Sequence, residues 1–346
     1  MKNTFSTVSK PFLAILASVA LCFFLLMISG YDAVKAFSAL FEASFRSARG
    51  FGNMLNKACP LLFAGIAVAF SFRGSVFNLG AEGQFMLGAI ASTWVGTTFI
   101  HLSGSLLIPL MVLSGALAGA IWGFFPGYFK AKQDVPEVIT TIMFNYIALH
   151  LAGYLVRYPM RDLTQFDPQS ASIAQQANFS YLIEGTKLHA GFFLGCIIAV
   201  IIGIVLFKTY LGYEVRAVGN NALAAKYGGI KVGPTIIATM LLSGAIAGIG
   251  GAVEVSGNAH YLYESISAGY GYTAIAVSIL ANNNPLSVIA TSMLFGFLSA
   301  GSTAMQRAVD VSASFVDVFQ GIIIIFVAIA AASVSKKRRY LRRKER

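Results

Sequence analysis

The sequence is short of charge. Only 11% of its 346 residues are Asp, Glu, Lys or Arg, whereas an ordinary soluble domain carries about 25%. A soluble core built by a chain of this length needs a charged surface around it, and this chain has too little charge to supply one. With 57% hydrophobic residues and a mean hydropathy of +0.72, the composition predicts an integral membrane protein.

Motifs of catalysis and metal binding are also missing. The sequence has no G-x-x-x-x-G-K-[ST] phosphate loop, no H-E-x-x-H and no G-x-S-x-G, so it cannot bind ATP through such a loop and offers no metallopeptidase or serine-hydrolase centre. Its three cysteines and four histidines are scattered without metal-ligand spacing. We therefore expect no catalytic residues, no metal and no cofactor.

Long charge-free windows dominate what remains. They cover residues 11–31, 58–72, 83–129, 138–156, 188–207, 232–253, 265–306 and 318–335. A membrane-spanning helix needs about 20 apolar residues, so two windows hold two crossings each, with breaks at 101–105 and 282–285. The fold class is thus an all-α polytopic membrane protein of about ten transmembrane helices. The weakest span is 58–72, which is too short unless Arg73 snorkels and the apolar run beyond it contributes.

Basic residues set the expected orientation. An even number of crossings puts both termini on one side, and that side collects 17 of the 25 Lys and Arg residues. By the positive-inside rule we expect both ends to be cytoplasmic. Residues 1–10 then form a cytoplasmic N-terminus, and residues 335–346 form a basic tail that contacts anionic membrane lipid rather than nucleic acid.

Two polar segments interrupt the transmembrane domain, which spans residues 11–334. The external segment, 157–187, either caps an entrance or is a solvated connector. In the cytoplasmic segment, 208–233, Asn221 is placed to cap a short helix over 222–227 that ends at Gly228 and Gly229, with Pro234 starting the next span. Its alanine-rich face is suited to docking another protein, although an interfacial amphipathic turn has the same pattern.

Small residues recur at helical spacing within the spans. Residues 115–123 read GALAGAIWG, and residues 244–252 read GAIAGIGGA. Gly or Ala at every fourth position lets two helix backbones approach closely. We expect these two segments to lie in tight helix–helix contacts.

A few polar residues stand inside the apolar windows. The stretch 76–90, VFNLGAEGQFMLGAI, combines Asn78, Glu82 and Gln84 with three glycines. A charged group within a span is a functional hypothesis by default. These side chains either fasten a bent or unwound helix around Gly80 and Gly83, or touch a transported solute. The candidate pathway residues are Asn78, Glu82, Gln84, Asn145, Glu254 and Asn258.

Three functional classes are compatible with these features. The first is a transport subunit energised by another chain, and the second is a transporter driven by protons through Glu82 or Glu254. The third, a lipid-modifying membrane enzyme, is least favoured because no nucleophile–base or metal pattern is present. The docking-like helix in 208–233 favours the first class over the second.

Four stretches resemble those of a known family: FNLGAEGQFMLGA (77–89), VPEVITTIMFNYIA (135–148), GYEVRAVGNNALAAKYGGI (212–230) and GYGYTAIAVSILANNNPLSVI (269–289). In this order the chain, from about residue 58 to 334, resembles the permease subunits of bacterial ABC importers for nucleosides. These belong to a broader group of permeases for simple sugars and branched-chain amino acids.

The resemblance implies a multi-pass permease of the bacterial cytoplasmic (inner) membrane with two pseudo-symmetric halves. It implies three protein partners: a second permease subunit, a cytoplasmic ABC ATPase and an external substrate-binding lipoprotein. The substrate would be a nucleoside, or alternatively a simple sugar, moved by alternating access. The segment 208–233 would be the ATPase-coupling loop, with Gly212, Arg216, Gly219, Asn220, Asn221, Ala224, Ala225, Tyr227 and Gly228 at the family's positions.

Overall fold

The computed structural model describes residues 16–183 and 185–312, together with positions 315, 318, 319, 321, 322, 325, 326 and 329. This part of the chain is helical, and its only β features are isolated bridges. Residues 1–10, the basic tail 335–346 and most of the last predicted span lie outside the described residues.

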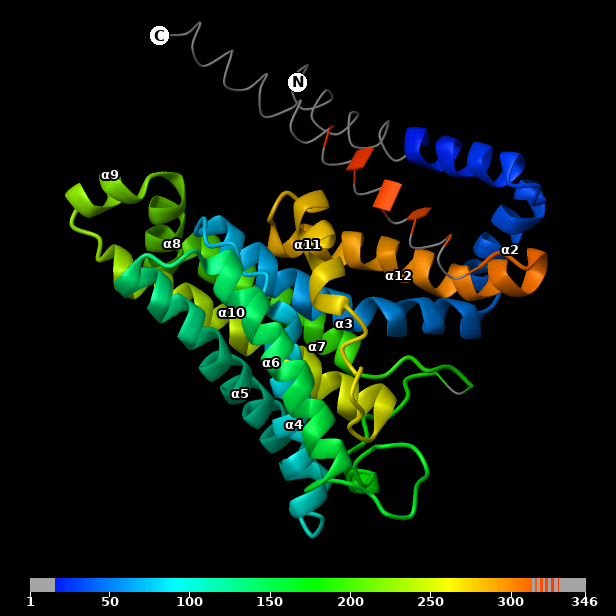
Figure 1. Cartoon of the computed structure of the whole chain (residues 1–346), viewed down its shortest axis with the longest axis horizontal. Coiled ribbons are helices and arrows are strands. Elements are labelled where there is room, and N and C mark those ends of the chain that lie inside the picture. Colours follow the sequence, from blue (N-terminus) through cyan, green and yellow to red (C-terminus); the bar gives the residue numbers. More distant parts are fainter. Residues whose placement is uncertain are drawn as a thin grey trace, which may run out of the picture. The chain divides into compact units, whose positions relative to one another are not determined.

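The helices follow one another with short connections, except for the long segment 158–190 (Figure 1). After an apolar helix at Leu16–Ile28, they are α2 (Ala33–Phe45), α3 (Ala48–Arg73), α4 (Ala81–Thr98), α5 (Gly104–Gln133), α6 (Glu137–Arg157), α7 (Gly191–Lys208), α8 (Tyr210–Asn220), α9 (Ala222–Tyr227), α10 (Val232–Glu254), α11 (Tyr270–Leu280) and α12 (Pro285–Val309). A 3-10 turn covers Gln175–Ala177, and a π-helical turn, η2 (Val255–Ala259), continues α10.

Within the described residues, six helices are long and apolar enough to cross a membrane: α3, α5, α6, α7, α10 with its π turn, and α12. The predicted breaks at 101–105 and 282–285 are confirmed, because α4 ends at Thr98 and α11 at Leu280. The explanation offered for the weak window 58–72 was wrong. Its helix gains length by starting at Ala48, and it ends at Arg73, so the apolar run beyond contributes nothing.

Two predicted crossings differ from simple spans. Helix α4 is almost entirely buried within the protein, so polar side chains there face protein rather than lipid. Helix α11 has only 11 residues, and at about 1.5 Å per residue it covers roughly half of a bilayer core of about 30 Å. Helix α11 alone is therefore shorter than a simple span.

The chain forms two compact units. One comprises Met1–Lys57 and Leu294–Arg346, and the other comprises Ala58–Met293. In the described part of the first unit, Phe41, Phe45 and Phe297 form an aromatic cluster. The second unit contains every candidate functional residue.

Helices α4, α5 and α10 of the second unit pack most extensively against one another. The two glycine-rich segments lie in tight helix–helix contacts, as predicted, and the structure shows that they contact each other. A Cβ atom on Gly244 would lie 2.2 Å from the carbonyl oxygen of Gly119, and one on Gly248 would lie 2.1 Å from that of Gly115. The backbones touch, so these positions have no room for a side chain.

The second unit has two distinct ends (Figure 1). One carries α8 and α9. The other carries the segment after α6, which is bound to the backbone that follows α10: Ser170 donates to the carbonyl of Leu262, Ile173 to that of His260, and Phe179 to that of Ser256. The predicted external segment is therefore folded onto the bundle.

Candidate functional site

The stretch between α3 and α4, residues 74–80, is the connector around which the candidate site is built. The helix is interrupted up to Gly80, as predicted, whereas Gly83 lies inside the regular helix α4. The Oδ1 of Asn78 accepts a hydrogen bond of 2.9 Å from the N–H of Gly80, and α4 starts at the next residue. The expectation that a neighbouring amide would satisfy the freed backbone is thus confirmed for Asn78.

Asn78 also ties the connector to two helices. Its Nδ2 donates to the Oε1 of Gln84 and to the Oγ of Ser243, each at 2.8 Å. Ser243, on α10, in turn donates to the carbonyl of Ala67 on α3. All of these side chains are buried. A fully paired polar group in an apolar interior fixes the relative position of the elements it joins.

Glu82, at the start of α4, binds the start of α11. Its carboxylate accepts hydrogen bonds from the backbone N–H groups of Gly269 (3.0 Å) and Gly271 (2.6 Å). The first N–H groups of a helix have no partner within the helix and carry partial positive charge, so a carboxylate is well suited to this position. Glu82 is 8% exposed and acts here as the cap of another helix.

Asn145 fastens α6 to the same region. Its Oδ1 accepts from the N–H of Gly83 (2.9 Å), and its Nδ2 donates to the carbonyl of Leu79 (2.8 Å) and to the hydroxyl of Tyr272 (3.2 Å). Four of the six predicted pathway residues therefore belong to one buried polar network around the start of α4. Through it, α3, α4, α6, α10 and α11 are held together.

The other two predicted residues form a separate pair. The Nδ2 of Asn258 donates to the Oε1 of Glu254 at 2.6 Å, one turn apart where α10 passes into the π turn η2. Glu254 is 3% exposed. Within the described part of the chain, no group of three or more Cys, His, Asp or Glu residues is arranged to hold a metal ion.

The short helix of the predicted coupling loop has the predicted bounds. It is α9, Ala222–Tyr227, and the Oδ1 of Asn221 accepts a hydrogen bond of 3.0 Å from the N–H of Ala224. Ala225 packs inward against Val218 and Ile230, whereas Ala224 is exposed. Leu223 and Tyr227 are 64% and 86% exposed, so α9 presents an apolar tip outside the spans.

The remaining residues of this loop shape its base. Thr209 accepts from the N–H of Gly212, Asn220 donates to the carbonyl of Arg216, and Gly228 ends α9. The guanidinium of Arg216 donates to the carbonyl of Leu206 and lies over the ring of Phe207.

The end of α8 rests on the connector. The Oγ of Ser75 donates to the carbonyl of Gly219 at 2.6 Å, and a Cβ atom on Gly219 would lie 2.0 Å from the carbonyl oxygen of Arg73. Arg73 itself donates to the carbonyls of Asn282 and Asn283 after α11. The predicted coupling loop and the buried polar network therefore meet at residues 73–80.

Sequence reasoning did not single out several residues of this site. Ser243, Gly271 and Tyr272 lie far along the chain from their partners, and a serine or glycine in a span carries no signal of its own.

A sequence profile of the family described as "Branched-chain amino acid transport system / permease component" matches residues 50–328. The chain belongs to this permease family. It is a multi-pass protein of the cytoplasmic (inner) membrane and a permease of the ABC transporter group that includes nucleoside and simple-sugar systems.

Individual relatives cover most of the chain. It is 36% identical to the guanosine ABC transporter permease protein NupP of Bacillus subtilis over 339 residues, 95% of each chain. It is 34% identical to the glucose ABC transporter permease protein TsgB13 of Haloferax volcanii, over 92% of this chain and 86% of the relative. For the nucleoside ABC transporter permease protein NupB of Lactococcus lactis the values are 32%, 95% and 93%. The same Lactococcus strain has a second nucleoside permease, NupC, with 30% identity over 72% of this chain and 80% of the relative.

Proposed function

We propose that this chain is one of two permease subunits of an ATP-driven importer of nucleosides. The observation that carries this proposal is the similarity to guanosine and nucleoside permeases along nearly the whole chain. The paired nucleoside permeases of one Lactococcus strain support a second, similar subunit as partner. A cytoplasmic ATPase and an external substrate-binding lipoprotein complete the machine.

Import of a simple sugar is the second candidate. A glucose permease is 34% identical to this chain over 327 residues, close to the value for the nucleoside permeases. The same machinery would serve either cargo, since a ribonucleoside contains a sugar. Proton transport through Glu82 is disfavoured, because both oxygens of its carboxylate accept hydrogen bonds from backbone N–H groups.

The proposed topology places the α8–α9 end in the cytoplasm. That end of the second unit holds seven of its basic residues: Arg73, Lys130, Lys132, Lys208, Arg216, Lys226 and Lys231. The opposite end, with 157–187, holds three: Arg157, Arg161 and Lys187. This asymmetry is typical of a cytoplasmic face. Ten transmembrane segments in two pseudo-symmetric halves, with both termini cytoplasmic, complete the proposed arrangement.

The contacts suggest how movement at the coupling loop reaches the membrane interior. ATP-driven closure of the ATPase would displace α9 and with it α8. Gly219 rests on the backbone of the connector, and the connector is fixed to α4 by Asn78. Glu82 and Asn145 extend the connection to α11 and α6. These helices would move together when the permease alternates between outward and inward access.

In this account the polar network fastens moving parts, and Tyr272 is where it meets the solute pathway. Tyr272 is 45% exposed and receives a hydrogen bond from Asn145, so its ring is available to stack on a flat base. Asn78, Glu82 and Gln84 then shape the wall from behind. Glu254 and Asn258 occupy the distorted end of α10 and would hold that turn open toward the pathway.

The external segment offers a contact for the binding lipoprotein. Leu163 and Phe166 are 86% and 98% exposed. Because they lie beyond the end of α6 and outside the predicted spans, lipid would not cover them. Large apolar side chains held in water at a loop tip are typical of protein-contact sites. We assign them to delivery of the substrate.

The test is uptake of radiolabelled inosine and ribose into proteoliposomes. These would contain this chain, its partner permease and ATPase, with binding protein outside and ATP or a non-hydrolysable analogue inside. Inosine uptake that requires hydrolysis supports the proposal. Ribose uptake alone would keep the machine and change the cargo, and uptake that ignores ATP would refute an ABC mechanism.

A further inference from the structure

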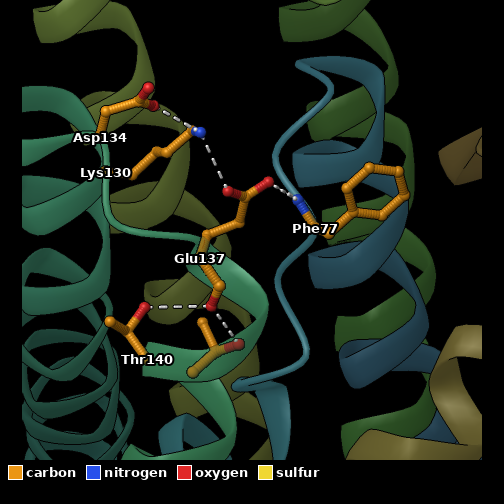
Figure 2. Close-up of polar contacts among 6 residues, drawn as sticks. Phe77, Lys130, Asp134, Glu137 and Thr140 are labelled. Carbon is orange, nitrogen blue, oxygen red and sulfur yellow. Dashed lines mark hydrogen bonds and ion pairs between the residues drawn. The ribbon is translucent and has the colours of Figure 1, made fainter.

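Glu137 lies between the connector and the end of α5, and it has no role in the mechanism proposed above. It is the first residue of α6, and its side chain is only 10% exposed. Thr140 and Thr141 donate to its backbone carbonyl and hold the helix start in place (Figure 2). The carboxylate points away from α6, toward the connector on one side and the end of α5 on the other (Figure 2).

The two contacts of this carboxylate are both long. Its Oε1 accepts from the N–H of Phe77 at 3.3 Å, and its Oε2 lies 3.5 Å from the Nζ of Lys130. A charge-assisted hydrogen bond between an ammonium and a carboxylate is about 2.7–2.9 Å long. The carboxylate is thus held loosely by its counter-ion, while the positive end of α6 stabilises its negative charge.

Lys130 is shared between two acids. Its Nζ is 2.8 Å from the Oδ1 of Asp134 and 3.5 Å from Glu137. The side chain of Asp134 is 89% exposed, so that pair is weakened by water. A pair with the buried Glu137 would be screened less and would gain more from a shorter distance. The ammonium of Lys130 therefore has two carboxylates within reach.

Lys130 also lies near α9, the short helix of the predicted coupling loop. Lys130 and Asp134 line a cavity of about 740 Å³ together with Ala222, Leu223 and Lys226 of α9. A displacement of α9 changes this cavity and the surroundings of the Lys130 ammonium directly. Beyond Glu137, the next group in the chain of contacts is the N–H of Phe77, adjacent to Asn78, which holds the start of α4.

We propose that Glu137 is the positioning residue that transmits movement of α9 to the connector. As α9 shifts, the ammonium of Lys130 moves between Asp134 and Glu137. This movement changes how firmly the carboxylate of Glu137 holds the backbone N–H of Phe77. This route is distinct from the contact of Gly219 with the connector. It rests on the proposed function, because it assigns a residue to the coupling step of the same importer.

The test is the number of solute molecules taken up per ATP hydrolysed in reconstituted transporter. Glu137→Gln keeps an oxygen for the N–H of Phe77 but removes the ion pair, and Lys130→Gln removes it from the other partner. We expect each to lower the ratio at least about fivefold, the low end of typical coupling effects, while ATP hydrolysis persists. The matched control is Lys132→Gln, an exposed lysine at the same helix end, which should leave the ratio unchanged.

Two further variants keep the inference open to refutation. The double variant Glu137→Gln with Lys130→Gln should be no worse than either single one, because both remove the same interaction. The conservative variant Glu137→Asp, which keeps a carboxylate at the start of α6, should retain more of the ratio than Glu137→Gln. A wild-type ratio in Glu137→Gln would overturn the proposal, and so would a parallel loss of hydrolysis, uptake and folded protein, which marks a purely structural role. Wild-type transporter without ATP-dependent uptake would instead refute the proposed function.

Discussion

The carboxylate of Glu82 accepts a hydrogen bond of 2.6 Å from the backbone N–H of Gly271, 189 positions later in the chain. This contact joins the start of α4 to the start of α11 and makes the acid a structural partner of a backbone segment. A buried acid in a membrane protein is often assigned to solute or proton binding. Here its two oxygens are occupied by Gly269 and Gly271.

Replacing Glu82 by Gln should therefore destabilise the protein. Glutamine offers one acceptor oxygen and an NH₂ group, so one of the two backbone N–H groups loses its partner, which costs about 1–3 kcal/mol. We expect a lower thermal unfolding midpoint in detergent and reduced uptake. The control Glu42→Gln removes only an exposed ion pair and should not shift the midpoint. Uptake lost with an unchanged midpoint would indicate direct solute or proton contact instead.

The glycine contact between α5 and α10 gives a second prediction. Gly244→Ala would place a Cβ atom 2.2 Å from the carbonyl oxygen of Gly119, forcing two packed backbones apart at a cost of about 1–3 kcal/mol or more. Gly233→Ala is the control, because its Cβ atom would have no neighbour closer than 3.7 Å. Alanine favours a helix over glycine by up to about 1 kcal/mol, so the control should be neutral or stabilising in thermal unfolding. Equal effects at both positions would contradict backbone contact.

The cap of α9 can be tested by a conservative series. Asn221→Ala removes the acceptor for the N–H of Ala224 and should weaken this helix by about 1 kcal/mol, whereas Asn221→Ser keeps a capping oxygen. We expect binding of the ATPase to the permease in detergent, measured by co-elution, to fall with alanine and to be retained with serine. Equal binding by both variants would show that the cap has no part in docking.

His189 should make the stability of the protein depend on pH. It is 1% exposed and stacks on Phe179, and burial, with a smaller effect of His260, lowers its pKa to about 4. The folded protein holds this side chain neutral, whereas the unfolded chain takes up a proton near its ordinary pKa of about 6.5. The stabilisation is complete above that value and is lost as pH falls toward 4, by up to about 3 kcal/mol.

The measurement is the thermal unfolding midpoint at about pH 7.5 and at about pH 5, on either side of the ordinary histidine pKa. His189→Gln should reduce the difference between the two values. His101→Gln, at an exposed histidine, should leave the difference as it is in the wild type. An unchanged difference in His189→Gln would assign the pH dependence to other groups.

The features predicted correctly from the sequence depend on neighbours in the chain. The helix over 222–227 needs only Asn221 before it and Gly228 after it, and the break before α4 needs only Asn78 and its glycines. The partners of Glu82 could not be predicted, because a cap supplied by a distant segment leaves no local pattern. The true start of α3 was missed since Lys57 interrupts its apolar run, although a helix continues through a single lysine without difficulty.

In the proposed mechanism, ATP hydrolysis by the partner ATPase drives nucleoside transport, and the ATPase acts on this chain through the exposed tip of α9. The most direct measurement is the rate of inosine uptake by the reconstituted transporter, wild type against Leu223→Ser with Tyr227→Ala. We predict uptake that requires hydrolysable ATP and falls at least about tenfold in the double variant, since truncating a docking hot spot costs about 2 kcal/mol or more. Inosine uptake that proceeds equally without hydrolysable ATP, or that the double variant leaves intact, would contradict the account.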